Sequence, residues 1–352
     1  MRKLNSLKNL FYGLSGQIII NLLSFVVRII FIQKLGIYYL GVGSLFTIIL
    51  QIFSVGELGI GTAIFVLLFK PLAENDQSKI NALINYYQKT FHIIGMSVFT
   101  FGVILLPFLT HIIKSDTNVE NLHLIYFLFV VNSSISYFFS YYRALITADQ
   151  KEYIAFNNSN AFLFVQYIIQ LFVILFTSSY LLYLCVTILI TFSSNYSLSI
   201  IVKKRYPFLS ERNKYKLDKS YKKEIYKDIL AMMSHKVGRV VLLGTDNIIL
   251  SRFVGVYWIG LYSNYLLIIN VLNTLVSKVF SSLSASIGNL DEIDGKVKGY
   301  DIFKTVIFLG FWLYGFVSIC VFNLINPFIT TWIGVEYLLE RNIVLAMITS
   351  FF

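Results

Sequence analysis

The stretch "SGQIIINLLSFVVRIIFIQKLG", Ser15–Gly36, decides the fold class, because it is long and apolar enough to cross a bilayer. Arg28 lies deep inside it, and an arginine near the middle of a membrane span costs about 3 kcal/mol on insertion scales. Such a charge is kept where it faces a protein interior or a water-filled cavity. The segment therefore predicts a transmembrane helix that carries a functional polar site.

The composition extends this prediction to the whole chain. Of its 352 residues, 57% are apolar and 13% are charged, whereas a soluble domain has about 45–50% and 25%. Apolar runs of about 20 residues recur between short polar breaks. Runs such as "VILLPFL", Val103–Leu109, lack the alternation of a membrane β-strand. The first run is too long for a signal peptide and has no small-residue cleavage site. We expect an all-α polytopic membrane protein.

Nine full spans are predicted from the apolar runs, and a tenth begins near Ile343. Their approximate bounds are Leu10–Leu35, Tyr39–Phe69, Ile84–Ile113, Leu122–Ala148, Tyr153–Thr177, Tyr180–Val202, Ile229–Val254, Trp258–Ile287 and Ile302–Ile329.

The basic residues orient these spans. With the N-terminus in the cytoplasm, 21 of the 29 lysines and arginines lie on the inner side, four lie outside and four lie within spans. This bias follows the positive-inside rule. Ten of the inner charges lie in one loop, Lys203–Asp228, which we expect to rest on anionic lipid. Nothing else in the chain supports nucleic-acid binding.

A repeat divides the chain on either side of this loop. "LGIYYLGVGSL", Leu35–Leu45, matches "VGVYWIGLYSN", Val254–Asn264, at an offset of 219 residues. Because six spans separate the copies, both have the same orientation, as in transporters built from parallel repeats. We predict a six-helix lobe over 1–205, a basic linker over 206–226 and a second lobe over 227–352. On this offset Phe352 corresponds to Ser133, so the second lobe is predicted to be truncated after about nine full spans.

The first span carries a polar stripe. Gln17, Asn21 and Ser24 precede Arg28 by eleven, seven and four residues. At 100° per residue, the four lie within roughly 60° of one another on the helix. Lipid cannot solvate this stripe, so we expect it to line a polar cavity.

The seventh span, the repeat partner of the first, has similar residues. Lys236, Arg239 and Asp246 fall on one face of "SHKVGRVVLLGTDNII", Ser234–Ile249. One interpretation is an internal ion network, and the other is a cavity wall that binds an anion. The intramembrane cations, which include Lys278 as well as Arg28, outnumber Asp246 and Glu57, and this excess favours anion binding. Glu57 could pair with Arg28 or bind a coupling H⁺ or Na⁺.

Other chemistry is not indicated. Cys185 and Cys320 lie in apolar spans, and the four histidines have no metal-ligand spacing. The outer loops are too short and too poor in acids for a membrane glycosyltransferase or polymerase. We expect no enzyme, no metal site and no cofactor.

The chain resembles the polysaccharide-exporter branch of the multidrug/oligosaccharidyl-lipid/polysaccharide (MOP) superfamily. The resemblance rests on "FVVRIIFIQKLGIYYLGVGSLFTIIL", on "ELGIGTAI" followed by "LFKPLAENDQSKI", and on "GTDNIILSRFVGVYWIGLYSNY". Members of this branch flip undecaprenyl-linked repeat units of O-antigen, capsule or exopolysaccharide, and typically have twelve to fourteen spans in two lobes around a central, often cationic cavity.

The resemblance implies a role for the cations. The cargo would be an undecaprenyl-pyrophosphate-linked oligosaccharide in a bacterial cytoplasmic membrane. Arg28, Lys236, Arg239 and Lys278 would bind the pyrophosphate, and rocking of the lobes would move it across. A gradient of H⁺ or Na⁺ could drive transport, and polysaccharide polymerase machinery is a candidate partner. The sugar and the coupling ion stay open.

Two alternatives remain at this point. A multidrug exporter of the same superfamily would usually take cationic drugs, against which the excess of intramembrane cations argues. A non-transporting scaffold of polymer synthesis is the other.

Overall fold

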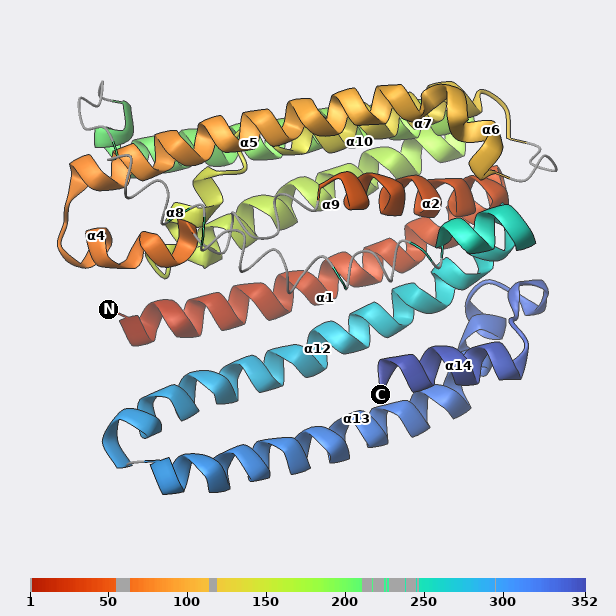
Figure 1. Ribbon diagram of the computed structural model, residues 1–352. Coiled ribbons are helices and arrows are strands. Elements are labelled where there is room, and N and C mark those ends of the chain that lie inside the picture. Colours follow the sequence, from red (N-terminus) through yellow and green to blue (C-terminus); the bar gives the residue numbers. More distant parts are fainter. Residues whose placement is uncertain are drawn as a thin grey trace. The chain divides into compact units, whose positions relative to one another are not determined.

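The computed structural model describes residues 2–54, 64–113, 119–210, 217, 225, 227, 238, 245, 247–294 and 296–352 (Figure 1). Within these ranges the chain forms helices joined by turns, and no residue is in a strand. The helices fall into two compact units, Met1–Ile259 and Gly260–Phe352. The predicted all-helical class is therefore confirmed for the described part of the chain.

Long helices that pack side by side form the first unit. Helix α1 packs mainly against α9, α9 packs against α10, and α7 packs against both α5 and α10. The elements are α1 (Arg2–Leu35), α2 (Ile37–Phe53), α4 (Phe69–Ala73), α5 (Gln77–Leu105), η1 (Leu106–Phe108), α6 (Leu109–Ile112), α7 (Leu122–Ser136), α8 (Tyr142–Ala148), α9 (Glu152–Thr177), α10 (Tyr180–Arg205), η2 (Pro207–Ser210), η3 (Leu250–Val254) and the first turn of α12 (Val256–Asp294).

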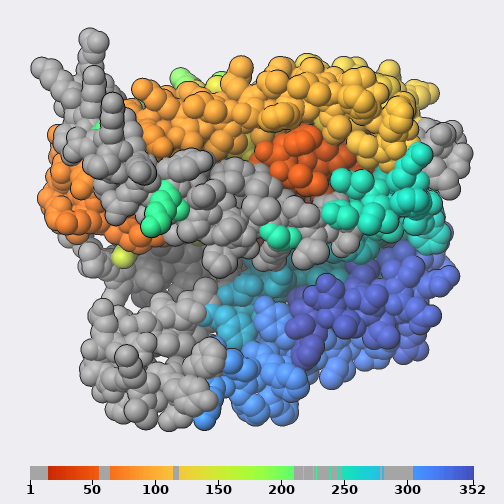
Figure 2. Space-filling view, in the orientation of Figure 1, coloured from red at the N-terminus to blue at the C-terminus, as the bar shows by residue number. Residues whose placement is uncertain are grey.

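Six helices in the described residues are long and apolar enough to cross a membrane. Large apolar side chains on their surfaces remain exposed, as expected for residues that face lipid. Helix α5 runs along one face of the first unit (Figure 2), and it exposes Ile93, Met96, Phe101 and Ile104 at nearly helical spacing. The chain is accordingly a multi-pass membrane protein by the length and composition of its helices.

Side-chain caps fix the start of two spans. The Asp76 carboxylate accepts a hydrogen bond from the Lys79 amide at 2.9 Å and caps α5. This helix therefore begins at Gln77, seven residues before the predicted start at Ile84. Ser179 caps α10 in the same way, through the Leu182 amide. The apolar run predicted a later start because four of the first seven residues of α5 are polar, namely Gln77, Ser78, Lys79 and Asn81.

The fourth predicted span, Leu122–Ala148, is not one continuous helix. It breaks between α7 and α8, where Phe139 adopts a left-handed φ of 68°. Serine hydroxyls compete for backbone groups here: Ser136 donates to the Ser133 carbonyl and Ser140 to the Tyr137 carbonyl. The Asn195 amide of α10 donates to the freed Ser136 carbonyl at 3.0 Å. The serine hydroxyls thus bond to backbone carbonyls at the place where the helix is interrupted.

The two stretches that match at an offset of 219 residues turn in the same way. Gly36 separates α1 from α2 with φ 90° and ψ 165°. Gly255 separates η3 from α12 with φ 117° and ψ 163°. A side chain is strained in this region of backbone conformation, so glycine is needed at both corners.

In the second unit, α12 continues to Asp294, and α13 (Lys296–Trp332), η4 (Val335–Tyr337) and α14 (Arg341–Phe351) follow. The fully buried Tyr265 of α12 joins this helix to α13 and to the segment between η4 and α14. Its hydroxyl donates to Asn326 Oδ1 at 2.8 Å and accepts from the Leu339 amide at 2.9 Å. The Arg341 guanidinium lies 4.9 Å from the centre of the Phe322 ring, which fastens the start of α14 to α13.

Several predictions lie partly or wholly outside the described residues. The predicted span Tyr39–Phe69 contains α2 and helical residues from Ile64 onward, but residues 55–63 between them are not described. Most of the predicted span Ile229–Val254 and most of the linker over 206–226 are also outside. The domain boundaries and the two-lobe arrangement stay predictions.

Candidate functional site

The polar stripe of α1 is a hydrogen-bonded unit. Gln17 Nε2 donates to Asn21 Oδ1 at 2.9 Å, and Ser24 Oγ donates to the Asn21 carbonyl at 2.7 Å. All three residues are half-buried, as is Arg28 one turn further along. Some polar groups of the stripe therefore hydrogen-bond to one another, and Arg28 lies at the end of the stripe.

Helix α9 lies against this stripe. A Cβ atom added to Gly16 would sit 2.0 Å from Asn160 Nδ2, so the glycine lets the two helices approach at the start of the stripe. Asn158, two residues before Asn160 on α9, is buried, and its side-chain amide donates to the Ser194 carbonyl of α10 at 2.9 Å. Amide groups thus line the interfaces that α9 makes with both neighbouring helices.

Three tyrosines surround Arg28. Its guanidinium interacts electrostatically with Tyr183, Tyr167 and Tyr180, which come from α10 and α9. We call these three residues the tyrosine cluster. Phenol oxygens and ring faces stabilise a neighbouring cation without neutralising it. The charge of Arg28 is therefore held inside the bundle of α1, α9 and α10.

Packing fixes the tyrosine cluster in place. Phe31, one turn beyond Arg28, contacts Tyr180 and Tyr183 with ring centres 5.5 Å and 5.3 Å away. The rings of Tyr180 and Tyr183 stack at 5.9 Å. A Cβ atom on Gly43 of α2 would lie 2.8 Å from the Tyr180 hydroxyl, so this glycine leaves room for the phenol. The side chains around Arg28 are therefore preorganised.

One buried amide lies beside the cluster. Gln170 follows Tyr167 by one turn on α9 and is fully buried. Its Nε2 donates to Thr187 Oγ1 at 2.9 Å and to the Tyr183 carbonyl at 3.5 Å. Its Oε1 accepts no hydrogen bond from the residues that the structure describes. An acceptor is thus available near a fixed cation.

Gln17, Asn21, Ser24 and Arg28 all lie on α1, and that they line a polar cavity stays a prediction. Sequence reasoning did not point to the neighbouring residues of α9 and α10. The missed signal was the polar content of α9, "NNSNAFLFVQYIIQ", Asn157–Gln170, which is unusual for a membrane span. Tyrosines carry no such signal, because the chain contains 24 of them and nothing in the sequence distinguishes these three.

The structure does not describe the side chains of the other predicted site residues. Glu57, Lys236, Arg239 and Asp246 lie outside the described residues, and of Lys278 only the backbone, within α12, is described. Whether these residues share a cavity with Arg28 stays a prediction. Among the residues that the structure does describe, no three His, Cys, Asp or Glu side chains are grouped so as to hold a metal ion.

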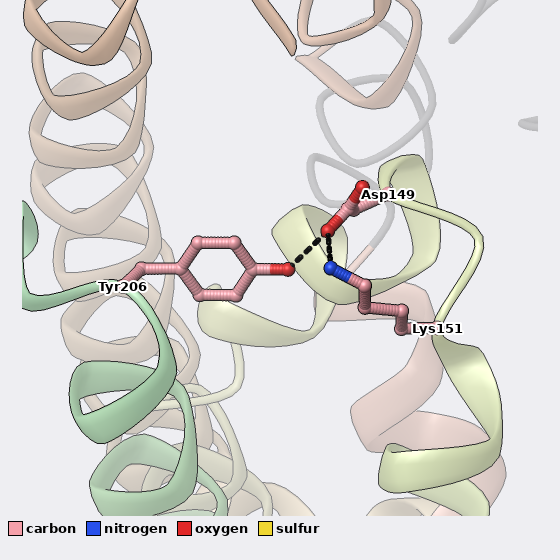
Figure 3. A network of polar contacts seen from close by, with 3 residues as sticks. All are labelled: Asp149, Lys151 and Tyr206. Atoms are coloured by element: carbon pink, nitrogen blue, oxygen red, sulfur yellow. Dashed lines mark hydrogen bonds and ion pairs between the residues drawn. The ribbon is translucent and has the colours of Figure 1, made fainter. Parts of the chain in front are cut away.

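A second polar cluster lies where α8, α9 and α10 end or begin (Figure 3). The Asp149 carboxylate accepts hydrogen bonds from the Tyr206 hydroxyl and from Lys151 Nζ. The ammonium of Lys151 also lies 5.5 Å from the centre of the Tyr206 ring. Burial, and then the hydrogen bond to Asp149, raise the pKa of Tyr206 above its usual range. We call these three residues the corner network.

No family model matches the chain, and no curated protein matches it significantly. Among solved structures, it is similar to the inward-facing conformation of a multidrug resistance MATE family transporter of the MOP superfamily. The TM-score is 0.67 at 11% identity, over 93% of this chain and 76% of that one. It is also similar to a chain named protein A, with a TM-score of 0.64 at 17% identity over 99% of this chain and 78% of the other. At these identities the likeness establishes the fold alone: the described chain folds like a MATE-type transporter of the MOP superfamily.

Proposed function

We propose that this protein flips lipid-linked oligosaccharides, and specifically undecaprenyl-pyrophosphate-linked repeat units, across the cytoplasmic membrane for surface polysaccharide synthesis. The transporter-type fold supports a role in moving a cargo across a bilayer. The choice of cargo rests on the sequence resemblance and on Arg28. We expect no enzymatic step, because translocation of such a lipid makes and breaks no covalent bond.

The observation that carries the proposal is the setting of Arg28. A guanidinium in a membrane span, fixed by packing and surrounded by neutral phenols, retains a positive charge in a region of low dielectric constant. A pyrophosphate cannot enter hydrocarbon without replacing its hydration. Guanidinium binds phosphate oxygens through two parallel hydrogen bonds, so Arg28 could supply that replacement.

The proposal extends to the second repeat by symmetry. Lys236, Arg239 and Lys278 would add positive charge opposite Arg28, and Glu57 and Asp246 would balance part of it or bind a coupling H⁺ or Na⁺. The undecaprenyl chain would stay in lipid while the lobes rock and expose the cavity to each side in turn. Anionic lipid would hold the basic linker at the inner surface.

A multidrug exporter is the second candidate, since the solved transporter of similar fold is described as one. Its usual cargo is cationic, and a fixed guanidinium repels a cation in a medium of low dielectric constant. Drug resistance conferred by this protein, with no effect on surface polysaccharide, would favour this candidate.

The test is complementation of a strain that lacks its own repeat-unit flippase. The wild-type protein should restore surface polysaccharide. Arg28→Gln should reduce it to background, and Arg28→Lys should restore only part, because ammonium keeps the charge but loses the bidentate geometry. Lys204→Gln is the control, since it removes one exposed positive charge at the end of α10, away from Arg28 in the sequence and outside the predicted cation site. Normal polysaccharide from Arg28→Gln, at equal protein level in the membrane, contradicts the proposal.

A further inference from the structure

Two residues that the repeat makes equivalent lie in contact. Tyr38 and Tyr257 correspond at the offset of 219 residues. Their ring centres are 5.5 Å apart with an angle of 51° between the ring planes. Each tyrosine is the second residue of the helix that follows a left-handed glycine, Gly36 in one case and Gly255 in the other. The two corners therefore present the same side chain from the same backbone conformation.

A second contact fastens the same corner. Ser251 of η3 is fully buried, and its hydroxyl donates to the Ile112 carbonyl at the end of α6 at 3.1 Å. The Gly255 amide donates to the Leu250 carbonyl at 2.8 Å, which closes the turn before α12. These bonds hold the corner of Gly255 against the end of α6, and thus help to set the position of Tyr257.

The contact between two equivalent residues indicates where the symmetry axis of the repeat lies. In an assembly of two equivalent parts, a residue touches its own counterpart only close to the axis that relates them. In a transporter made of parallel repeats, that axis runs along the membrane normal through the cargo path. The Tyr38–Tyr257 contact would then lie across that path, at the membrane face where α1 and η3 end.

We infer that Tyr38 and Tyr257 form an aromatic gate at this face of the membrane, closed in the structure, which must part in each transport cycle. The inference rests on the proposed function, because a gate requires a transporter. It assigns a role to two residues that are not among the predicted cations. The contact is between two aromatic rings, so the gate needs the rings and not the phenol oxygens.

The experiment replaces Tyr38 and Tyr257 by cysteine in a background with Cys185→Ala and Cys320→Ala. A protease site in the basic linker reports cross-linking, because the two halves then stay together after cleavage. A short, reducible bifunctional methanethiosulfonate should join the pair and reduce transport to background, and reductant should restore it. The matched control is Phe99→Cys with Phe127→Cys. Their rings are 6.3 Å apart and both lie within the first six predicted spans, so cross-linking them should leave transport intact.

Three outcomes overturn the inference. They are failure of the Tyr38–Tyr257 pair to cross-link, cross-linking without loss of transport, and equal inhibition by the control pair. If the double-cysteine variant is inactive before cross-linking, the gate is tested by the rate of cysteine labelling instead. Replacing both tyrosines by alanine should accelerate the labelling of a cysteine at Ser44 by an impermeant reagent several-fold, and an unchanged rate rejects the gate. Lack of polysaccharide with the wild-type protein would refute the proposed function instead, while the cross-linking yield still reports on the contact.

Discussion

Arg28 and the corner network are two places where this chain combines charge with tyrosine, and they do so differently. Asp149 and Lys151 are two residues apart and carry opposite charges, and Tyr206 donates to the same carboxylate. Arg28 lies within a membrane span, and its neighbours include three neutral phenols from two other helices. In the first case a carboxylate and an ammonium pair where helices end, whereas in the second a guanidinium lies among phenol rings where helices pack.

This difference indicates what each site is for. Lys151 balances the charge of Asp149, so this site has no net charge to attract an ion, and the corner network is suited to fixing the junction of α8, α9 and α10. A guanidinium that faces phenols retains its attraction for an anion. The comparison predicts that changes at Arg28 affect transport and that changes in the corner network affect stability.

The largest expected effect is on transport, from the double variant Arg28→Gln, Glu57→Gln. If Arg28 only balanced Glu57, replacing both would leave transport largely intact, because a buried ion pair is often dispensable when both partners are removed together. If Arg28 binds the pyrophosphate, the double variant should fail as completely as Arg28→Gln alone. We expect the second result, measured as surface polysaccharide in the flippase-null strain.

Glu57→Gln alone is the control for this experiment, and the membrane content of each variant must match the wild type. Normal polysaccharide from the double variant would show that Arg28 is a structural partner of Glu57. Arg28 and the corner network would then both be structural charge pairs.

The all-helical class and the grouping of four polar residues on one face of α1 could be predicted from the sequence, because both depend on local patterns; the role of that face stays a prediction. Apolar run length identifies membrane helices, and a period of 3.6 residues places Gln17, Asn21, Ser24 and Arg28 on one face. The break at Phe139 was not predictable from run length, since the segment contains neither proline nor glycine. It depends on hydroxyl groups that compete with the backbone and on Asn195, which lies 59 residues away from Ser136. The tyrosine cluster likewise requires knowledge of how α1, α9 and α10 pack.

The next effect concerns stability, through Asp149→Asn. The substitution keeps the shape of the side chain but removes the charge that Lys151 and Tyr206 face, which should cost about 1–3 kcal/mol. The apparent melting temperature of the purified protein in detergent should fall by a few degrees, while surface polysaccharide in the complementation strain stays near normal at permissive temperature. Full stability with lost transport would place the corner network in the transport machinery and reverse the comparison.

Tyr206 makes the corner network sensitive to alkaline pH. Its folded-state pKa is raised, by burial and by the hydrogen bond to Asp149, above the value of about 10 for an exposed tyrosine. The unfolded state therefore loses this proton first, so the contribution of Tyr206 to stability is complete below pH 10 and is lost as pH rises towards the folded pKa.

Tyr206→Phe should accordingly have two effects on melting in detergent. At neutral pH the loss of one hydrogen bond should cost about 1 kcal/mol. Above about pH 10, where an exposed tyrosine ionises, the melting temperature of the variant should fall less steeply than that of the wild type. Identical alkaline slopes would show that the raised pKa of Tyr206 has no measurable effect on stability.

The smallest effect should come from Glu152→Gln, next to the corner network. Glu152 pairs with Arg143 at 3.9 Å, and the two side chains are 32% and 45% exposed. Solvent screens a pair of this kind, so its loss should change stability by less than about 0.5 kcal/mol. Arg143 would also keep its position over the Phe156 ring, 5.8 Å from the ring centre.

Glu152 begins α9 only three residues after Asp149. Equal losses of stability from Glu152→Gln and Asp149→Asn in the melting experiment would therefore mean that any charge change at this junction destabilises it. A loss confined to Asp149→Asn would assign the stability to the hydrogen bonds that Tyr206 and Lys151 donate.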